Sequence, residues 1–137
     1  MTIKVAIAED FGLVRREIIS LLNELDTIDV VAEFTDGQEL LSYLASHPVD
    51  VALLDCDMPG LGGVGTCLKM MENRLDVPAI MLSTHQDKSK LDEAVQAGAR
   101  GFLFKHSSLG EYHNAILRVH QGGTYFSSEV VDDLLEP

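Results

Sequence analysis

Acidic, hydroxyl and amine side chains stand directly after four apolar runs of this sequence. They are Glu9, Asp10, Asp55, Asp57, Ser83, Thr84 and Lys105. If the runs are parallel strands of one sheet, these groups converge at one edge of it. Carboxylates that lie close together repel one another and raise each other's pKa values unless a cation intervenes. Mg²⁺ suits such a site, because it binds carboxylates and completes its shell with water and phosphate oxygens.

Asp55 stands at the centre of this set and has the chemistry of a nucleophile. An aspartate carboxylate can attack phosphorus and form an aspartyl phosphate. A bound Mg²⁺ and Lys105 would neutralise charge on the transferring group, and Ser83 would donate a hydrogen bond to it. The segment DCDMPG, residues 55–60, indicates an exposed carboxylate on a stiff loop.

Each of these residues has a plainer interpretation when it is taken alone. Glu9 and Asp10 could favour the N-terminus of a following helix through its dipole. Lys105 could be a solvated surface lysine, and Ser83 or Thr84 could cap a helix. Their order along the chain, with each group at the end of its own apolar run, favours one shared site.

Five apolar runs alternate with five amphipathic stretches, and this alternation predicts the fold. The runs cover residues 3–8, 30–34, 49–54, 77–82 and 101–104. Apolar residues at helical spacing follow each run, and the fourth of these stripes is thin, with Leu91, Ala94 and Val95. Short connections require parallel strands joined by crossover helices. We therefore expect an α/β fold, a doubly wound five-stranded parallel sheet with helices on both faces, which binds ligands at the carboxyl ends of its strands.

Composition limits the location and the partners of the chain. Its 137 residues fit one domain. The sequence has 10 Lys+Arg against 22 Asp+Glu, a formal net charge of −12 that argues against nucleic-acid binding by these residues. No run approaches the ~18 apolar residues of a membrane span. Cys56 and Cys67 lack the C-x-x-C spacing and are expected to be reduced thiols, so we expect a cytoplasmic protein without a membrane partner.

The order of these motifs resembles the receiver domains of two-component response regulators, the CheY-like proteins. The resemblance covers residues 3 to about 121. It implies that Glu9, Asp10 and Asp55 hold Mg²⁺ and that Asp57 contributes a backbone carbonyl to the metal. It also implies that Asp55, in the pattern of an apolar strand followed by D-x-x-M-P-G, is the phosphoacceptor.

The same resemblance assigns a switch to the remaining residues. Ser83, which Thr84 follows, matches the hydroxyl residue that senses the phosphoryl group, and Lys105 matches the lysine of the family motif. Phe102 matches the aromatic switch position, where the lack of a tyrosine hydroxyl leaves switching to packing alone. His106 follows the lysine where the family often has a proline, and the sequence leaves the isomer of this peptide bond open.

The resemblance implies a signalling switch rather than a turnover enzyme. A sensor histidine kinase or a phosphotransfer protein would phosphorylate Asp55, and the acyl phosphate would later hydrolyse on the protein itself. The segment GGTYFS, residues 122–127, resembles the NarL/FixJ subgroup. We therefore expect a receiver domain over residues 1–123 and a tail or linker over 124–137. Transcription would be regulated through a LuxR-type DNA-binding domain outside this chain, with a homodimer as one option.

Two other functions fit parts of the pattern. Aspartyl phosphatases of the haloacid dehalogenase type share the D-x-D spacing of Asp55 and Asp57, although their motif usually follows the first strand. A phosphate-independent interaction module would keep the fold, but it would have no need of Asp10, Ser83 and Lys105. Steady hydrolysis of phosphomonoesters would indicate the first alternative. Amide spectra that beryllofluoride with Mg²⁺ leaves unchanged would indicate the second.

Overall fold

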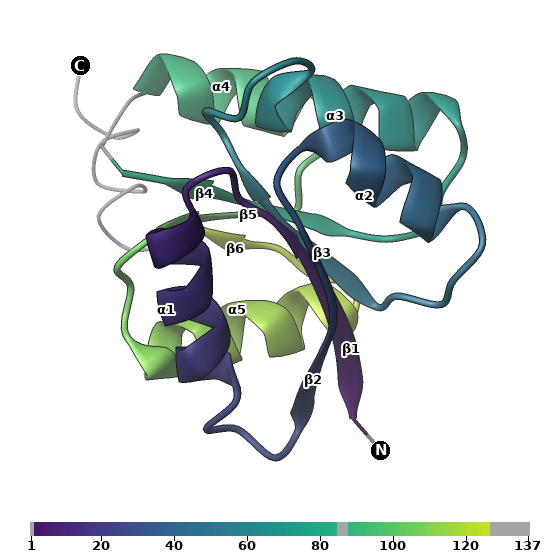
Figure 1. Ribbon diagram of the computed structural model, residues 1–137. Helices are drawn as coiled ribbons and strands as arrows, with labels where there is room; N and C mark the ends of the chain where they lie inside the picture. The colour runs from purple at the N-terminus through teal and green to yellow at the C-terminus, as the bar shows by residue number, and fades with distance from the viewer. Residues whose placement is uncertain (1, 85–87, 127–137) are drawn as a thin grey trace.

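The computed structural model describes residues 2–84 and 88–126, which form a parallel sheet between two layers of helices (Figure 1). The strand order is β2-β1-β3-β4-β5-β6, and all neighbouring strands are parallel. The strands are β1 (Ile3–Ala8), β2 (Ile28–Phe34), β3 (Val51–Asp55), β4 (Ala79–Ser83), β5 (Gly101–Phe104) and β6 (Tyr125–Phe126). The helices are α1 (Gly12–Leu22), α2 (Gly37–Leu44), α3 (Gly62–Glu72), α4 (Lys88–Gln96) and α5 (Leu109–His120). The strand order reverses at β1, so a crevice is expected at the carboxyl ends of β1 and β3.

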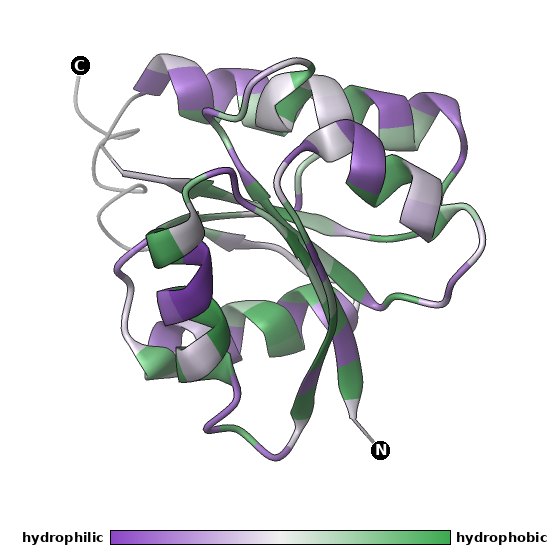
Figure 2. Ribbon diagram, viewed as in Figure 1, coloured by the Kyte–Doolittle hydropathy of each residue, from purple (hydrophilic) through white to green (hydrophobic). Residues whose placement is uncertain are grey.

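The two faces of the sheet carry separate apolar clusters. Helices α1 and α5 cover one face, and α2, α3 and α4 cover the other (Figure 1). Successive residues of β3 alternate between the clusters, Leu53 toward α1 and α5, and Leu54 toward the other three helices. This two-sided burial explains why the central strands are apolar over most of their length, as the hydropathy colouring in Figure 2 shows. The expected doubly wound architecture is confirmed.

The strand pairing of β3 and β4 extends into two residues expected at the site, Asp55 and Ser83. The apolar runs suggested that the third and fourth strands end at residues 54 and 82. In the structure Asp55 still pairs with Leu82, and Ser83 still pairs with Phe104. Both side chains are buried. Asp55 and Ser83 are therefore held by the sheet itself rather than by the loops that follow it.

Helix α4 is the most lightly anchored of the helices that cover its face. Only Leu91 and Ala94 are buried along it. Val95, which the helical spacing placed on the same stripe, is 49% exposed, so that part of the expected stripe is wrong. By contrast, α2 buries four residues in a helix of 8. Little apolar burial therefore fixes α4 to the sheet.

A sixth strand extends the five that the sequence predicts. The chain turns after α5 at Gly122, whose φ is +93°, a conformation that favours glycine. The Tyr125 N–H then donates to the Arg100 carbonyl at 2.9 Å, and Phe126 packs against the apolar cluster that contains Phe102. Two residues are too few for a periodic signal, which is why the sequence did not indicate this strand. The rest of the expected tail, residues 127–137, lies outside the described residues.

Among the described residues, no helix combines the length and the apolar character that crossing a membrane requires.

Candidate functional site

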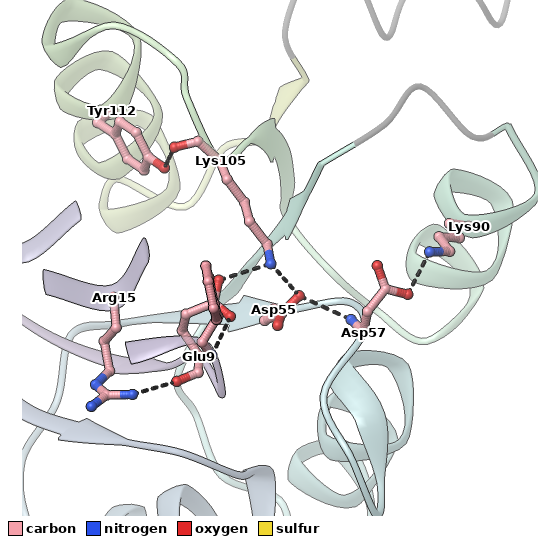
Figure 3. A network of polar contacts seen from close by, with 8 residues as sticks. Glu9, Arg15, Asp55, Asp57, Lys90, Lys105 and Tyr112 are labelled. Carbon is pink, nitrogen blue, oxygen red and sulfur yellow. Dashed lines mark hydrogen bonds and ion pairs between the residues drawn. The ribbon is translucent and has the colours of Figure 1, made fainter. Parts of the chain in front are cut away.

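The carboxyl ends of β1, β3 and β5 bring two carboxylates and a lysine into contact. Ala8 pairs with Leu54, so Glu9 and Asp55 lie side by side just beyond this pair. The Nζ atom of Lys105 lies 2.9 Å from Glu9 Oε1 and 3.0 Å from Asp55 Oδ1 (Figure 3). The sequence predicts that these three residues converge, and the structure brings them together.

Both carboxylates of this cluster are removed from water. Glu9 is 0% exposed and Asp55 is 1% exposed. The interpretation of Asp55 as an exposed carboxylate on a loop is therefore wrong, because the β3–β4 ladder continues to Asp55 and encloses it. Its Oδ1 atom accepts a hydrogen bond from the Asp57 N–H at 2.9 Å. Its Oδ2 atom is buried without a hydrogen-bond partner among the described residues.

The pKa values of the cluster follow from this burial and these contacts. Burial, together with the neighbouring Asp55, raises the pKa of Glu9 from 4.5 to about 7. For Asp55, burial alone would raise the pKa, but the Glu9 carboxyl, the Asp57 N–H and Lys105 outweigh it and lower the pKa. Burial opposes the charge on Lys105, yet its two carboxylate partners hold its pKa above the usual value. Asp55 is thus ionised and Lys105 is positively charged at neutral pH.

Three carboxylates at this edge form a candidate metal site. One oxygen from each of Glu9, Asp10 and Asp55 lies within 4.8 Å of the others. Asp10 is exposed to solvent, and burial and the nearby Asp55 raise its pKa. Hard oxygen ligands, an open solvent side and the unpartnered Asp55 Oδ2 fit a divalent cation such as Mg²⁺.

The other expected site residues surround this cluster in different ways. The Asp57 carboxylate turns away from Asp55 and forms an ion pair with Lys90 of α4 (Figure 3). Ser83 is buried at the end of β4, and its carbonyl accepts a hydrogen bond from the Lys105 N–H at 2.9 Å. Thr84 follows it and is exposed.

Phe102 lies inside the core rather than on the surface. It is 1% exposed and belongs to the apolar cluster beneath α2, α3 and α4. Its partner in the β4 ladder is Met81, two residues before Ser83. The expected switch residues therefore lie on adjacent strands. Every peptide bond among the described residues is trans, including the bond between Lys105 and His106.

The two cysteines do not compete with Asp55 as nucleophiles. Both are free thiols. Burial, with the charges of Asp57 and Asp55, raises the pKa of Cys56 to about 12. Burial raises the pKa of Cys67 to about 11. A thiol with so high a pKa carries little thiolate at neutral pH, and the thiolate is the reactive form.

Sequence reasoning missed residues that hold the site in place. The Arg15 guanidinium donates to the Glu9 carbonyl at 2.8 Å and to the Glu33 carboxylate at 2.8 Å. The buried Tyr112 hydroxyl donates to the Lys105 carbonyl at 2.6 Å. The sequence gives no sign that the Tyr112 hydroxyl has a polar partner. Contacts of this kind depend on tertiary packing and leave no local sequence signal.

Comparison with known proteins shows the family of this chain. Residues 5–117 match the model of the response regulator receiver domain. The chain belongs to this family. This receiver domain is 33% identical over 132 residues to the response regulator UvrY of Escherichia coli K12, and the match covers 96% of the chain and 61% of UvrY. It is 32% identical to the response regulator GacA of Pseudomonas syringae, with 96% of the chain and 62% of GacA covered.

Solved structures agree with the family assignment. The receiver domain of the response regulator NarL from Mycobacterium tuberculosis is similar, with a TM-score of 0.84 and 31% identity over 88% of this chain and 98% of that chain. The expected likeness to the NarL and LuxR-type regulators is therefore confirmed. The receiver domain described here spans about 61% of the length of UvrY. Members of this family are signalling proteins rather than typical turnover enzymes.

Proposed function

We propose that this receiver domain is a phosphorylation switch that accepts a phosphoryl group on Asp55. The observation that carries the proposal is the state of the Asp55 carboxylate. It is ionised and buried, Lys105 and the Asp57 N–H engage Oδ1, and Oδ2 has no hydrogen-bond partner among the described residues. A buried anion with one unengaged oxygen beside a fixed cation is suited to attack on phosphorus.

The phosphoryl group would come from a phosphohistidine of a sensor histidine kinase or a phosphotransfer protein. An Asp55 oxygen attacks phosphorus, the P–N bond breaks, and its electron pair returns to the imidazole. The ammonium of Lys105 then balances negative charge on the phosphoryl oxygens. Attack of water later returns the Asp55 carboxylate and inorganic phosphate, so the domain dephosphorylates itself.

Mg²⁺ is the proposed cofactor, and Glu9, Asp10 and Asp55 would hold it together with the backbone carbonyl of Asp57. When bound, the cation neutralises charge that develops on the transferring oxygens. The three carboxylates lie close enough together for one cation to bind them all. Arg15 of α1 holds the Glu9 backbone through a hydrogen bond to its carbonyl.

The signal would leave the site through Ser83 and Phe102. The Ser83 hydroxyl is proposed to bind the new phosphoryl oxygens, with Thr84 at the mouth of the site. Phe102 would then repack behind Ser83, because the two residues lie on adjacent strands of the same sheet. This change would alter the surface that α4, β5 and α5 present to an output.

The output is proposed to be transcription, as the name of one relative, the transcriptional regulatory protein LnrK of Bacillus subtilis, suggests. Residues 1–123 would form the receiver unit, and residues 124–137 would begin a linker to a LuxR-type DNA-binding domain. A homodimer is a further proposed partner state. The net charge of −12 disfavours direct contact of this chain with nucleic acid.

Labelling with acetyl phosphate tests the assignment of the acceptor. In the presence of Mg²⁺, we expect mass spectrometry to locate one added phosphoryl group on Asp55. Asp55→Asn removes the nucleophilic oxygen and should abolish the label. Asp57→Asn makes the same substitution two residues away, with the same loss of one negative charge, and should retain the label. A label that persists on the Asp55→Asn protein would show that another residue is the acceptor.

The phosphatase alternative is disfavoured by the direction of one side chain. In that chemistry the second aspartate of D-x-D acts as a general acid and base at the substrate. Here the Asp57 carboxylate is ion-paired with Lys90 and points away from Asp55 (Figure 3). Multiple turnover of a phosphomonoester by this chain would contradict this interpretation.

A further inference from the structure

An ion pair links the loop after β3 to the first turn of α4. The Lys90 ammonium reaches Asp57 Oδ1 from α4, whereas Lys105 reaches Asp55 from the end of β5 (Figure 3). Asp57 in turn donates its backbone N–H to Asp55 Oδ1 at 2.9 Å. Asp57 therefore connects the phosphoacceptor to α4. Its backbone N–H donates to Asp55, and its carboxylate pairs with Lys90 of α4.

This link is suited to being broken. The Lys90 and Asp57 side chains are 32% and 46% exposed, so water screens their attraction and the pair stabilises the fold little. Among the described residues of α4, only Leu91 and Ala94 are buried. Little buried apolar surface therefore opposes a movement of α4 against the sheet.

We propose that Lys90 exchanges Asp57 for the phosphoryl group when Asp55 is phosphorylated, and so couples the acyl phosphate to the position of α4. This inference rests on the proposed function. A phosphoryl group brings close to two negative charges and three acceptor oxygens, against the single charge of the Asp57 carboxylate. Lys90 would then touch the phosphoryl oxygens directly, as a second ammonium beside that of Lys105.

Binding of beryllofluoride with Mg²⁺, which mimics the acyl phosphate, measures the exchange. We expect Lys90→Gln to raise the dissociation constant by roughly 2- to 5-fold, as the loss of one partly exposed charged contact does. Lys90→Arg should keep most of the affinity. Lys88→Gln is the matched control, because it removes the same charge from the same turn of α4 and should leave the dissociation constant unchanged.

A double-mutant cycle with Asp57→Asn separates exchange from simple shielding. If Lys90 moves to the phosphoryl mimic, Asp57→Asn removes in advance the ion pair that has to break, so this substitution gains more affinity when Lys90 is present than in the Lys90→Gln background. If Lys90 only neutralises Asp57, the gain from Asp57→Asn is instead larger in the Lys90→Gln background. The reason is that Asp57 repels the mimic most strongly when Lys90 no longer neutralises its charge. The sign of the coupling therefore decides the question.

Three outcomes would overturn the inference while leaving the proposed function in place. They are a reversed coupling sign, strictly additive effects, and equal effects of Lys88→Gln and Lys90→Gln. All the altered side chains are at least partly exposed, and an unchanged circular dichroism spectrum confirms folding. Failure of the unaltered chain to bind beryllofluoride would instead contradict the proposed function.

Discussion

At the scale of single residues, the environment of Glu9 opposes the charge of its own carboxylate. It is buried beside Asp55 and shares the Lys105 ammonium with it. Burial and the second carboxylate raise the pKa of Glu9 to about 7, while that of Asp55 is lowered. Glu9 therefore holds a proton over part of the pH range in which the proposed switch would operate. A cation that binds the three carboxylates has to displace this proton.

Mg²⁺ affinity should accordingly depend on pH. Below about pH 7 the proton on Glu9 competes with the cation, so we expect the affinity to fall up to tenfold for each further unit of pH. Above pH 7 the affinity should level off. Titration of amide NMR signals with Mg²⁺ at pH 6 and pH 8 measures this difference. Glu9→Gln should bind the cation more weakly with a flatter profile, and equal affinities of the unaltered chain at the two pH values would refute the role of Glu9.

The reactive residues of this site could be predicted from sequence because of where they stand. Asp55 and Lys105 directly follow apolar runs, and parallel strands bring their carboxyl ends to one edge. The burial of Asp55 could not be predicted, because it depends on how far the ladder between β3 and β4 extends. Arg15 and Tyr112 could not be found either, since a basic residue and an aromatic residue on helices have many commoner uses.

At the scale of elements, the start of α3 depends on one glycine. A Cβ atom at Gly63 would lie 2.5 Å from the Asp55 carbonyl oxygen, 2.7 Å from Met81 Cε and 3.0 Å from Cys56 Cα. Two of these neighbours are backbone atoms at the end of β3. The absence of a side chain therefore allows α3 to approach the strand end that carries the phosphoacceptor.

Gly63→Ala should destabilise the protein by about 1–3 kcal/mol, because the added methyl group forces the helix and the strand apart. Gly65→Ala on the same helix is the matched control. Its Cβ would lie 3.4 Å from Leu61 Cβ, an acceptable contact, and replacing a helical glycine should stabilise the protein by about 0.5–1 kcal/mol. Urea unfolding measures both free energies. Equal shifts of the two variants would contradict a packing role specific to Gly63.

The elements themselves differ in how far the sequence indicates them. Five apolar runs with helical stretches between them predict five strands and five helices, and the structure confirms them. β6 could not be predicted, because its two residues are recognised only by their pairing with β5. The stripe of α4 was partly misjudged, since helical spacing alone cannot tell whether Val95 faces the sheet or the solvent.

At the scale of the whole molecule, individual helices are held to the sheet with unequal strength. On one face α5 buries Tyr112, Ala115, Ile116 and Val119. On the other face α4 buries only Leu91 and Ala94. Regions with few buried apolar contacts open at lower free energy than the rest of a domain. The molecule therefore combines a firm support beneath the phosphoacceptor with a loosely held helix beside it.

Native-state hydrogen exchange should reveal this difference within one molecule. We expect the amides of α4 to exchange through openings of lower free energy than those of α5, because α4 loses fewer apolar contacts when it opens. Leu91→Ala should lower the opening energy of α4 further, whereas Val95→Ala, at a position that is 49% exposed, should leave it nearly unchanged. Equal protection of α4 and α5 in the unaltered chain would contradict this distribution of stability. It would also remove the reason for regarding α4 as the element that a new charge on Asp55 can move.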